Sequence, residues 1–269
     1  MWGAGIALTV RSESRVSGHR LEGKQSSIKT RLGISSPPRP MSTTSQPQQS
    51  MNMTAKLCIG ALVFPGFQSL DLFGPLDIFN TLSLKHPIEL SVISTSLDPV
   101  STQWKEGQVA QSIVPTCTLE DARTDYDLLI VPGGFGTTKD VDPYVDYIKR
   151  AYPTTGSVLS VCTGTRLFAR AGILDGRRAT TNKNAFNDVT PLGPKTHWVA
   201  KARWVKDGNV WTAAGITAGI DATLAWVEDK YGAQQATDAA NWLEYKRTSD
   251  PDDDPFAAVR GIEDVLPTE

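Results

Sequence analysis

The sequence is poor in cysteine and has no long apolar run. Only three of its 269 residues are cysteines (Cys58, Cys117 and Cys162), and no two of them are closely paired. Such a set is a poor disulfide framework and favours a reducing compartment. No uninterrupted apolar stretch reaches about 18 residues, so the sequence predicts no membrane-spanning helix. We therefore expect a cytoplasmic protein.

An excess of positive charge is also lacking. The chain has 27 Lys and Arg residues against 29 Asp and Glu residues, and its formal net charge is -2. A basic footprint for nucleic acid or for an anionic membrane is therefore absent from the protein as a whole. The hydrophobic fraction of 40% supplies enough apolar surface for one large α/β domain or two small ones.

Residues 1–55 differ in composition from the rest of the chain. They are basic and poor in acidic residues, and Ser, Pro and Gln dominate from Ser26 to Gln49. Such a stretch buries too little apolar area to offset its chain entropy, which predicts disorder. The same composition is typical of a mitochondrial transit peptide, which would make the location mitochondrial. The alternative is an upstream extension of the reading frame, with Met41 or Met51 as the working start.

The other end of the chain is acidic. Residues 247–269 contain the run Asp250–Pro255, in which four of six residues are carboxylates. The run lacks the glycine and the terminal glutamate of a calcium loop, so we interpret it as a solvated acidic turn. This places the folded domain at residues 56–246, followed by an acidic tail.

Strand and helix patterns alternate inside that domain. The predicted strands are 57–64, 88–94, 126–131, 157–161, 202–206 and 210–213, with a short hairpin within 101–119. The predicted helices are 70–82, 141–152, 163–171, 219–231 and 234–245. Strands separated by helices imply an α/β fold, in which helices cover both faces of a parallel sheet.

Cys162 lies at a junction that suits a nucleophile. It directly follows the predicted strand at 157–161 and precedes a predicted helix, with Thr163 and Gly164 beside it. A tight turn exposes the thiol there, and the partial positive charge of the helix N-terminus favours the nucleophilic thiolate. This is the cysteine counterpart of the serine nucleophile elbow. On composition alone, an inert core cysteine is the alternative.

Two further motifs follow predicted strands, where ligands collect in open parallel sheets. The glycines of Pro132–Gly136 let the backbone approach a ligand, and successive N–H groups there can form an oxyanion hole. A plain loop is the alternative. Asp71 lies beyond the first strand, where it is either a first-turn helix carboxylate or an acid–base partner of a thiol.

Five motifs in order carry a family resemblance. They are Leu70–Pro75, Val131–Gly134, Ser160–Gly164, Ala179–Thr181 and Gly215–Asp221. The set resembles the ThiJ/PfpI superfamily, whose members have a flavodoxin-like, class I glutamine amidotransferase-like fold. The resemblance runs over about residues 56–245. Within the superfamily, the sequence is most similar to the isonitrile hydratase branch.

The resemblance implies an enzyme with a cysteine nucleophile. Cys162 would be that nucleophile, Asp71 its acidic partner, and Thr163 a hydrogen-bonding residue of the site. The remaining substrate-binding or oxyanion positions would be Gly133, Gly134, Phe135 and Asn182. Of these, Gly134 would help to hold developing negative charge through its N–H group. The resemblance also implies a homodimer that uses no cofactor and no metal and acts on a small electrophilic molecule.

Departures from the relatives narrow this function. Glyoxalase and deglycase relatives carry a Glu where Asp71 stands and a His where Asn182 stands, and peptidase-like relatives carry a His in place of Thr163. His197 is better interpreted as a structural histidine, and Asp221 as structural or dimer-linked. The leading hypothesis is therefore an isonitrile hydratase. The alternatives are a glyoxalase or deglycase acting on reactive carbonyls, and a non-catalytic redox sensor based on Cys162.

Overall fold

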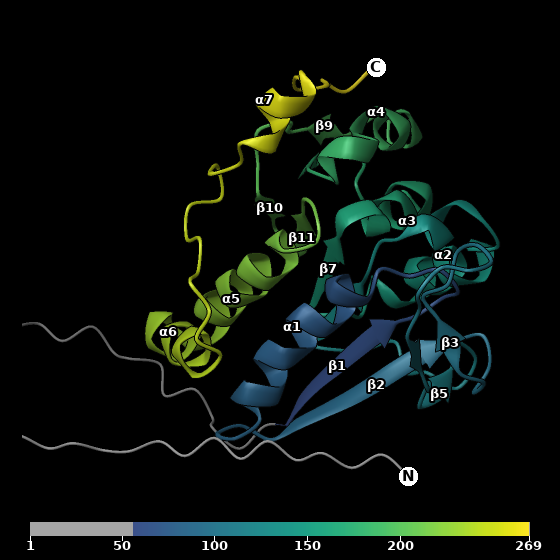
Figure 1. The fold of residues 1–269 in the computed structure, drawn as a ribbon, viewed down its shortest axis with the longest axis vertical. Helices are drawn as coiled ribbons and strands as arrows, with labels where there is room; N and C mark the ends of the chain where they lie inside the picture. Colours follow the sequence, from purple (N-terminus) through teal and green to yellow (C-terminus); the bar gives the residue numbers. More distant parts are fainter. Residues whose placement is uncertain (1–55, 269) are drawn as a thin grey trace, which may run out of the picture. The chain divides into compact units, whose positions relative to one another are not determined.

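A computed structural model describes residues 56–268 of the chain, so the predictions for residues 1–55 lie outside the described residues. A seven-stranded sheet forms the centre, with the order β10-β11-β7-β6-β1-β2-β5 (Figure 1). Its strands run parallel, except that β10 pairs antiparallel with β11 at one edge. The predicted α/β fold on a mainly parallel sheet is confirmed.

The predicted strands all appear, three with the predicted bounds and three with ends that differ by one or two residues. The main sheet contains β1 (Leu57–Leu62), β2 (Ile88–Ser94), β5 (Cys117–Thr118), β6 (Leu128–Val131), β7 (Ser157–Val161), β10 (Trp204–Asp207) and β11 (Val210–Ala213). Two small sheets pair β3 (Val100–Ser101) with β4 (Ser112–Ile113) and β8 (Arg178–Ala179) with β9 (His197–Trp198). The predicted hairpin within 101–119 is therefore β3–β4, whereas Cys117–Thr118 joins the main sheet beside β2.

Helices cover both faces of the sheet. They are α1 (Ser69–Leu82), α2 (Asp142–Ala151), α3 (Thr165–Ala171), α4 (Phe186–Val189), α5 (Ala218–Tyr231), α6 (Ala233–Trp242) and α7 (Phe256–Arg260). α1, α5 and α6 pack together, and α2 packs on α3. Short 3-10 turns are η1 (Phe135–Thr138), η2 (Cys162–Gly164), η3 (Lys183–Ala185) and η4 (Thr190–Leu192).

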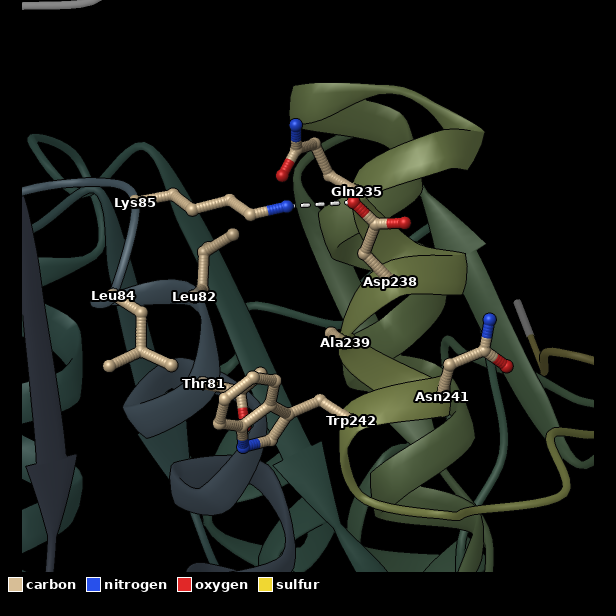
Figure 2. A pocket seen from close by; sticks show the side chains of 9 residues that line it. All are labelled: Thr81, Leu82, Leu84, Lys85, Gln235, Asp238, Ala239, Asn241 and Trp242. Atoms are coloured by element: carbon tan, nitrogen blue, oxygen red, sulfur yellow. Dashed lines mark hydrogen bonds and ion pairs between the residues drawn. The ribbon is translucent and has the colours of Figure 1, made fainter.

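The end of α1 and the side of α6 flank an open hollow of about 620 Å³. Lys85 lies after α1 and pairs with Asp238 of α6 at 2.8 Å, while Leu84 and Trp242 line the apolar part (Figure 2). Both of these apolar side chains are largely exposed. The hollow contains no cysteine and no histidine.

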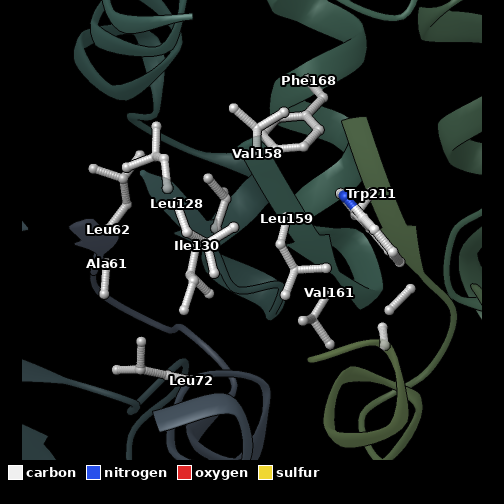
Figure 3. Packing of buried hydrophobic residues seen from close by; sticks show 14 of the residues in the cluster. Ala61, Leu62, Leu72, Leu128, Ile130, Val158, Leu159, Val161, Phe168 and Trp211 are labelled. Atoms are coloured by element: carbon white, nitrogen blue, oxygen red, sulfur yellow. The ribbon is translucent and has the colours of Figure 1, made fainter. Parts of the chain in front are cut away.

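The core is built from the central strands and the helices on either side. Leu159 and Val161 of β7 are fully buried and lie near Ile130 of β6 (Figure 3). Leu72 of α1 and Phe168 of α3 are also fully buried and belong to the same cluster. The strands have near-continuous apolar runs in the sequence because helices cover both faces of the sheet, so neither face is exposed to solvent. This packing fixes the strand ends that carry the site.

The segment after residue 246 differs from the sequence prediction. Asp254 is only 4% exposed, so the interpretation of residues 250–255 as a solvated turn is wrong at this position. It forms a buried ion pair with Lys183 at 3.3 Å, and Ala257 of α7 belongs to the core. Further on, Val265 bridges to Trp198 of β9. The buried ammonium group of Lys183 attracts the Asp254 carboxylate. The sequence around residue 254 does not reveal this partner, because Lys183 lies far away along the chain.

Candidate active site

Cys162 lies directly beyond the carboxyl end of β7, on a sharp turn. Its φ is +59°, a left-handed conformation that non-glycine residues rarely adopt. The Thr181 hydroxyl donates to the Cys162 carbonyl at 2.9 Å and helps to hold this turn. A Cβ on Gly164 would lie 2.3 Å from the Val131 carbonyl oxygen, so only glycine fits beside the turn. The predicted strand–turn–helix placement of Cys162 is confirmed.

The predicted exposure of the thiol is not found. Cys162 is only 7% exposed. Burial raises the pKa of Cys162 to about 12, and the charge of Asp71 adds to the rise. Hydrogen bonds from the N–H groups of Thr163 and Ile216 and from the Asn182 side chain oppose it. The rise in pKa caused by desolvation is therefore larger than the fall expected from the helix N-terminus. At neutral pH we expect Cys162 to be a thiol rather than a thiolate.

Asp71 lies in the first turn of α1 and is fully buried. Burial raises its pKa to about 7, while hydrogen bonds from the Gly133 N–H and the Cys162 thiol hold the pKa down. Its Oδ2 atom accepts the Gly133 N–H at 2.9 Å. Its Oδ1 atom is buried without a hydrogen-bond partner among the described residues. The structure thus brings the predicted carboxylate and thiol together, with one carboxylate oxygen available.

The glycine loop after β6 holds these two side chains in place. The Gly134 N–H donates to the Thr163 hydroxyl at 2.9 Å, and the Thr163 hydroxyl also lies 3.2 Å from the Gly134 carbonyl oxygen. The Gly133 N–H is taken by Asp71. Both N–H groups therefore already have partners, so the expected role of Gly134 as a free oxyanion donor does not match this arrangement. The loop instead positions Asp71 and Thr163.

Asn182 and Ile216 approach the sulfur from the other side. The Oδ1 atom of Asn182 caps η3 by accepting the N–H groups of Asn184 and Ala185 at 2.9 and 3.2 Å. This fixes the amide so that its NH₂ group is available to Cys162. Ile216 has a φ of +28°, which is unusual for a β-branched residue and aims its N–H at the sulfur. These two donors are better placed than the glycine loop to hold negative charge on the sulfur.

A cavity of about 300 Å³ opens onto Cys162. Many of its lining residues are polar, although more of its lining surface is apolar than polar, and they are Gln68, Gly134, Phe135, Thr137, Thr138, Thr163, Arg166, Asn182, Asn184, Ala185, Asp188 and Ile216. Phe135 is 65% exposed at the mouth, where its ring stacks on that of Trp104 with centroids 5.8 Å apart. The predicted residues Phe135 and Asn182 do line the cavity, and its size suits a small molecule.

Three residues of this site had no role assigned from the sequence, although Thr181 and Ile216 lie in two of the family motifs. Arg166 and Ile216 line the cavity, and Thr181 holds the Cys162 turn. Arg166 could have been found, because it lies four residues after Cys162 and so occupies the next helical turn. The motif Gly215–Asp221 contains Ile216, but the role of Ile216 depends on a backbone angle that the sequence does not show.

The residues interpreted as structural lie apart from Cys162. The Nε2 atom of His197 lies 3.2 Å from Asp264. Asp221 is fully buried and accepts hydrogen bonds from Arg203, Tyr245 and the Thr248 N–H. Within residues 56–268, no three His, Cys, Asp or Glu side chains gather closely enough to hold a metal ion. No helix in this part of the chain is long and apolar enough to cross a membrane.

Comparison with known proteins identifies the family of the chain. Residues 58–229 match the DJ-1/PfpI family. The chain is 35% identical over 211 residues to an isonitrile hydratase of Pseudomonas putida, covering 76% of this chain and 87% of that protein. It is 30% identical over 129 residues to a Parkinson disease protein 7 homologue of Danio rerio, covering 46% of this chain and 67% of that protein.

A solved structure extends the likeness to three dimensions. A ThiJ/PfpI family protein from Pseudomonas syringae superposes with a TM-score of 0.63 at 28% identity, covering 83% of this chain and 91% of that one. Drosophila melanogaster DJ-1beta shares the fold at 18% identity, with a TM-score of 0.60 over 71% of this chain and all of that one. The strand-end cysteine, the family match and the fold agree: the chain belongs to the DJ-1/PfpI family.

Proposed function

We propose that the chain is an isonitrile hydratase, which adds water to a small isonitrile and releases an N-substituted formamide. The observation that carries this proposal is the buried pair of Asp71 and Cys162, a carboxylate and a thiol that influence each other's pKa. The 35% identity to the Pseudomonas putida isonitrile hydratase supports the choice of reaction. The cavity beside Cys162 supports a small substrate.

The first half of the reaction needs one nucleophile and one proton. The sulfur of Cys162 attacks the terminal carbon of the isonitrile and forms a C–S bond. Asp71 takes the thiol proton and delivers it to the same carbon, giving a thioimidate, R–N=CH–S–Cys162. Because pKa values of about 7 and about 12 leave one proton on the pair between them, this state is available at neutral and mildly alkaline pH.

The second half consumes one water molecule. The Asp71 carboxylate accepts a proton from water as the water oxygen adds to the thioimidate carbon. The nitrogen gains a proton, the C–S bond breaks, and Cys162 recovers its own proton, so that R–NH–CHO is released. Donors from Asn182 and the Ile216 N–H stabilise negative charge on the departing sulfur. The sum is one isonitrile plus one water giving one formamide.

The test is formation of N-cyclohexylformamide from cyclohexyl isonitrile, followed by NMR. Turnover by the wild type and by Cys117→Ala is expected, since Cys117 lies on edge strand β5. Loss of turnover is expected for Cys162→Ala and for Asp71→Asn. Equal rates for the wild type and Cys162→Ala would refute the assignment, as would the absence of formamide from the wild type.

The two competing functions receive less support. A glyoxalase of this family type would use an imidazole for proton transfer, whereas Asn182 has an amide that caps η3 and carries no titratable proton. A redox sensor needs an exposed thiol of low pKa, whereas Cys162 is buried and its pKa is raised to about 12. Formation of lactate from methylglyoxal would support the glyoxalase. Modification by peroxide at Cys162 alone would support the redox sensor.

A further inference from the structure

The guanidinium of Arg166 lies in the cavity of Cys162 without an anionic partner. Within residues 56–268, no ion pair or side-chain hydrogen bond joins Arg166 to another group. Its Nε atom is shielded from solvent and unpartnered. Burial lowers the pKa of Arg166, and Asp188 only partly offsets this. A half-buried cation left in this way is costly unless something binds it.

Among the described residues that line the cavity, Arg166 is the one with a positively charged side chain. Asp188 lines the same cavity but is exposed at the rim, where solvent screens its charge. Arg170 is one helical turn further along α3 and is already paired with Asp142. Asp71, the remaining carboxylate, is deeply buried behind the thiol. An anionic group on a bound molecule would therefore meet Arg166 rather than another cation.

Arg166 and Cys162 line the same small site. Arg166 is four residues after Cys162, at the start of α3, and both side chains line a cavity of about 300 Å³. A guanidinium binds a carboxylate through paired N–H donors, which also fixes its orientation. We infer that the substrate is a small electrophile that carries a carboxylate, which Arg166 binds while the reactive carbon faces Cys162. This deepens the proposed function, and it rests on that function only for the identity of the electrophile.

A pair of alkylating probes tests the carboxylate preference without isonitrile chemistry. Iodoacetate and iodoacetamide both form a C–S bond to Cys162 and release iodide, while the thiol proton leaves to Asp71 or solvent. They are similar in size, and at the far end one has a carboxylate and the other a neutral amide. The ratio of their rates at Cys162 is measured by mass spectrometry, with Cys117 of the same molecule as the internal reference. Cys58 is unsuitable as a reference, because Arg123 already contacts its sulfur at 3.0 Å.

The expected result is a preference for iodoacetate at Cys162 over Cys117. Arg166→Gln should reduce that preference about tenfold or more, as expected for loss of a charge-assisted hydrogen bond. Arg166→Lys should keep part of the preference, and Arg170→Gln should leave it unchanged. A ratio at Cys162 that Arg166→Gln does not alter, or that Arg170→Gln alters equally, would overturn the inference.

The same variants separate this inference from the proposed function. With isocyanoacetate and its methyl ester as substrates, Arg166→Gln should raise KM for the acid about tenfold more than KM for the ester. Failure of the wild type to convert either isonitrile would sink the proposed function alone, since the alkylation ratio would still report on Arg166. Conversion of both with no preference for the acid, in wild type and Arg166→Gln alike, would sink the inference alone.

Discussion

Asp71, in the first turn of α1, and Cys162, directly after β7, come together in the interior of the protein. Asp71 is fully buried after β1, and Cys162 is 7% exposed after β7. Burial raises the pKa of each, because neither ionised form is well solvated there. The two groups therefore act as one titrating pair rather than as an independent acid and an independent thiolate.

The pair predicts how activity depends on pH. Below about pH 7 both groups are protonated, and Asp71 cannot accept the thiol proton. The rate of formamide formation should rise as Asp71 ionises, reach half of its maximum near pH 7, and stay level into mildly alkaline solution. A profile of kcat/KM between pH 5 and pH 9 measures this. A rate that falls between pH 6 and pH 8 would contradict the role of Asp71 as the proton acceptor.

Asp71→Asn should separate stability from activity. The pKa of the Asp71 carboxyl is about 7 in the folded protein, against an ordinary value of 3.8 that applies to the unfolded chain. Between these two pH values the folded protein therefore holds a proton on Asp71 that the unfolded chain has lost. Stability from this group is therefore present below about pH 4 and is lost as the pH rises through 7, by roughly 1.4 kcal/mol per pKa unit. Without a titrating carboxyl, Asp71→Asn should be more stable than the wild type at pH 8.

Urea unfolding at pH 4 and pH 8 checks this prediction. The difference between Asp71→Asn and the wild type should grow by a few kcal/mol from the lower to the higher pH. The variant should at the same time lose formamide formation at pH 8, where Asp71 of the wild type is ionised. A stability difference that is the same at both pH values would mean that Asp71 does not carry the raised pKa.

The sequence predicted the fold and the strand-end position of the site well. Apolar strands alternating with helices, and a nucleophile placed directly after one strand, are local patterns that the residues themselves carry. It also placed Cys162, Asp71 and Asn182 in one site through the family resemblance, and the structure brings these three together. The ionisation state was not predictable, because it depends on the desolvation of the thiol by residues distant in sequence.

Other differences have the same origin in long-range contacts. The prediction used the N–H of Gly134 as an oxyanion donor, but the hydroxyl of Thr163 already accepts it. The acidic run at residues 250–255 was expected in solvent, but Asp254 is buried against Lys183. In each case the environment of the residue depends on one partner that lies far away along the chain. The composition of the neighbouring sequence does not identify that partner.

The Gly133 position should tolerate no side chain. A Cβ there would lie 2.5 Å from the Thr163 backbone nitrogen and 2.9 Å from the Asp71 carboxylate. Gly133→Ala should therefore displace the acid and the turn together and reduce kcat at least about 100-fold, as misplacement by about 1 Å can do. Gly107→Ala is the control, because its φ of +77° strains alanine but nothing lies within 4 Å of its Cβ position, so it tests backbone strain without a clash. Steady-state rates that are equal for the two variants would argue against the packing described.

The last prediction concerns the ion pair that ties the C-terminal segment to the loop beside the site. Lys183 follows Asn182, and its ammonium group lies 3.3 Å from the Asp254 carboxylate and 2.6 Å from the Thr180 hydroxyl. Burial lowers the pKa of Lys183 to about 8, and Asp254 is the main group that opposes this. Removing the carboxylate would leave a buried, unpaired cation.

Asp254→Asn should therefore lower the free energy of unfolding by about 3–5 kcal/mol at pH 7. Asp253→Asn removes a neighbouring carboxylate that is exposed, and it should change the free energy by less than about 0.5 kcal/mol. Urea unfolding of both variants beside the wild type measures the contrast. The loss in Asp254→Asn should shrink at pH 9, because Lys183 then sheds its proton more readily than it can in the unfolded chain. Equal stability of the two variants would show that Asp254 is not needed to neutralise Lys183.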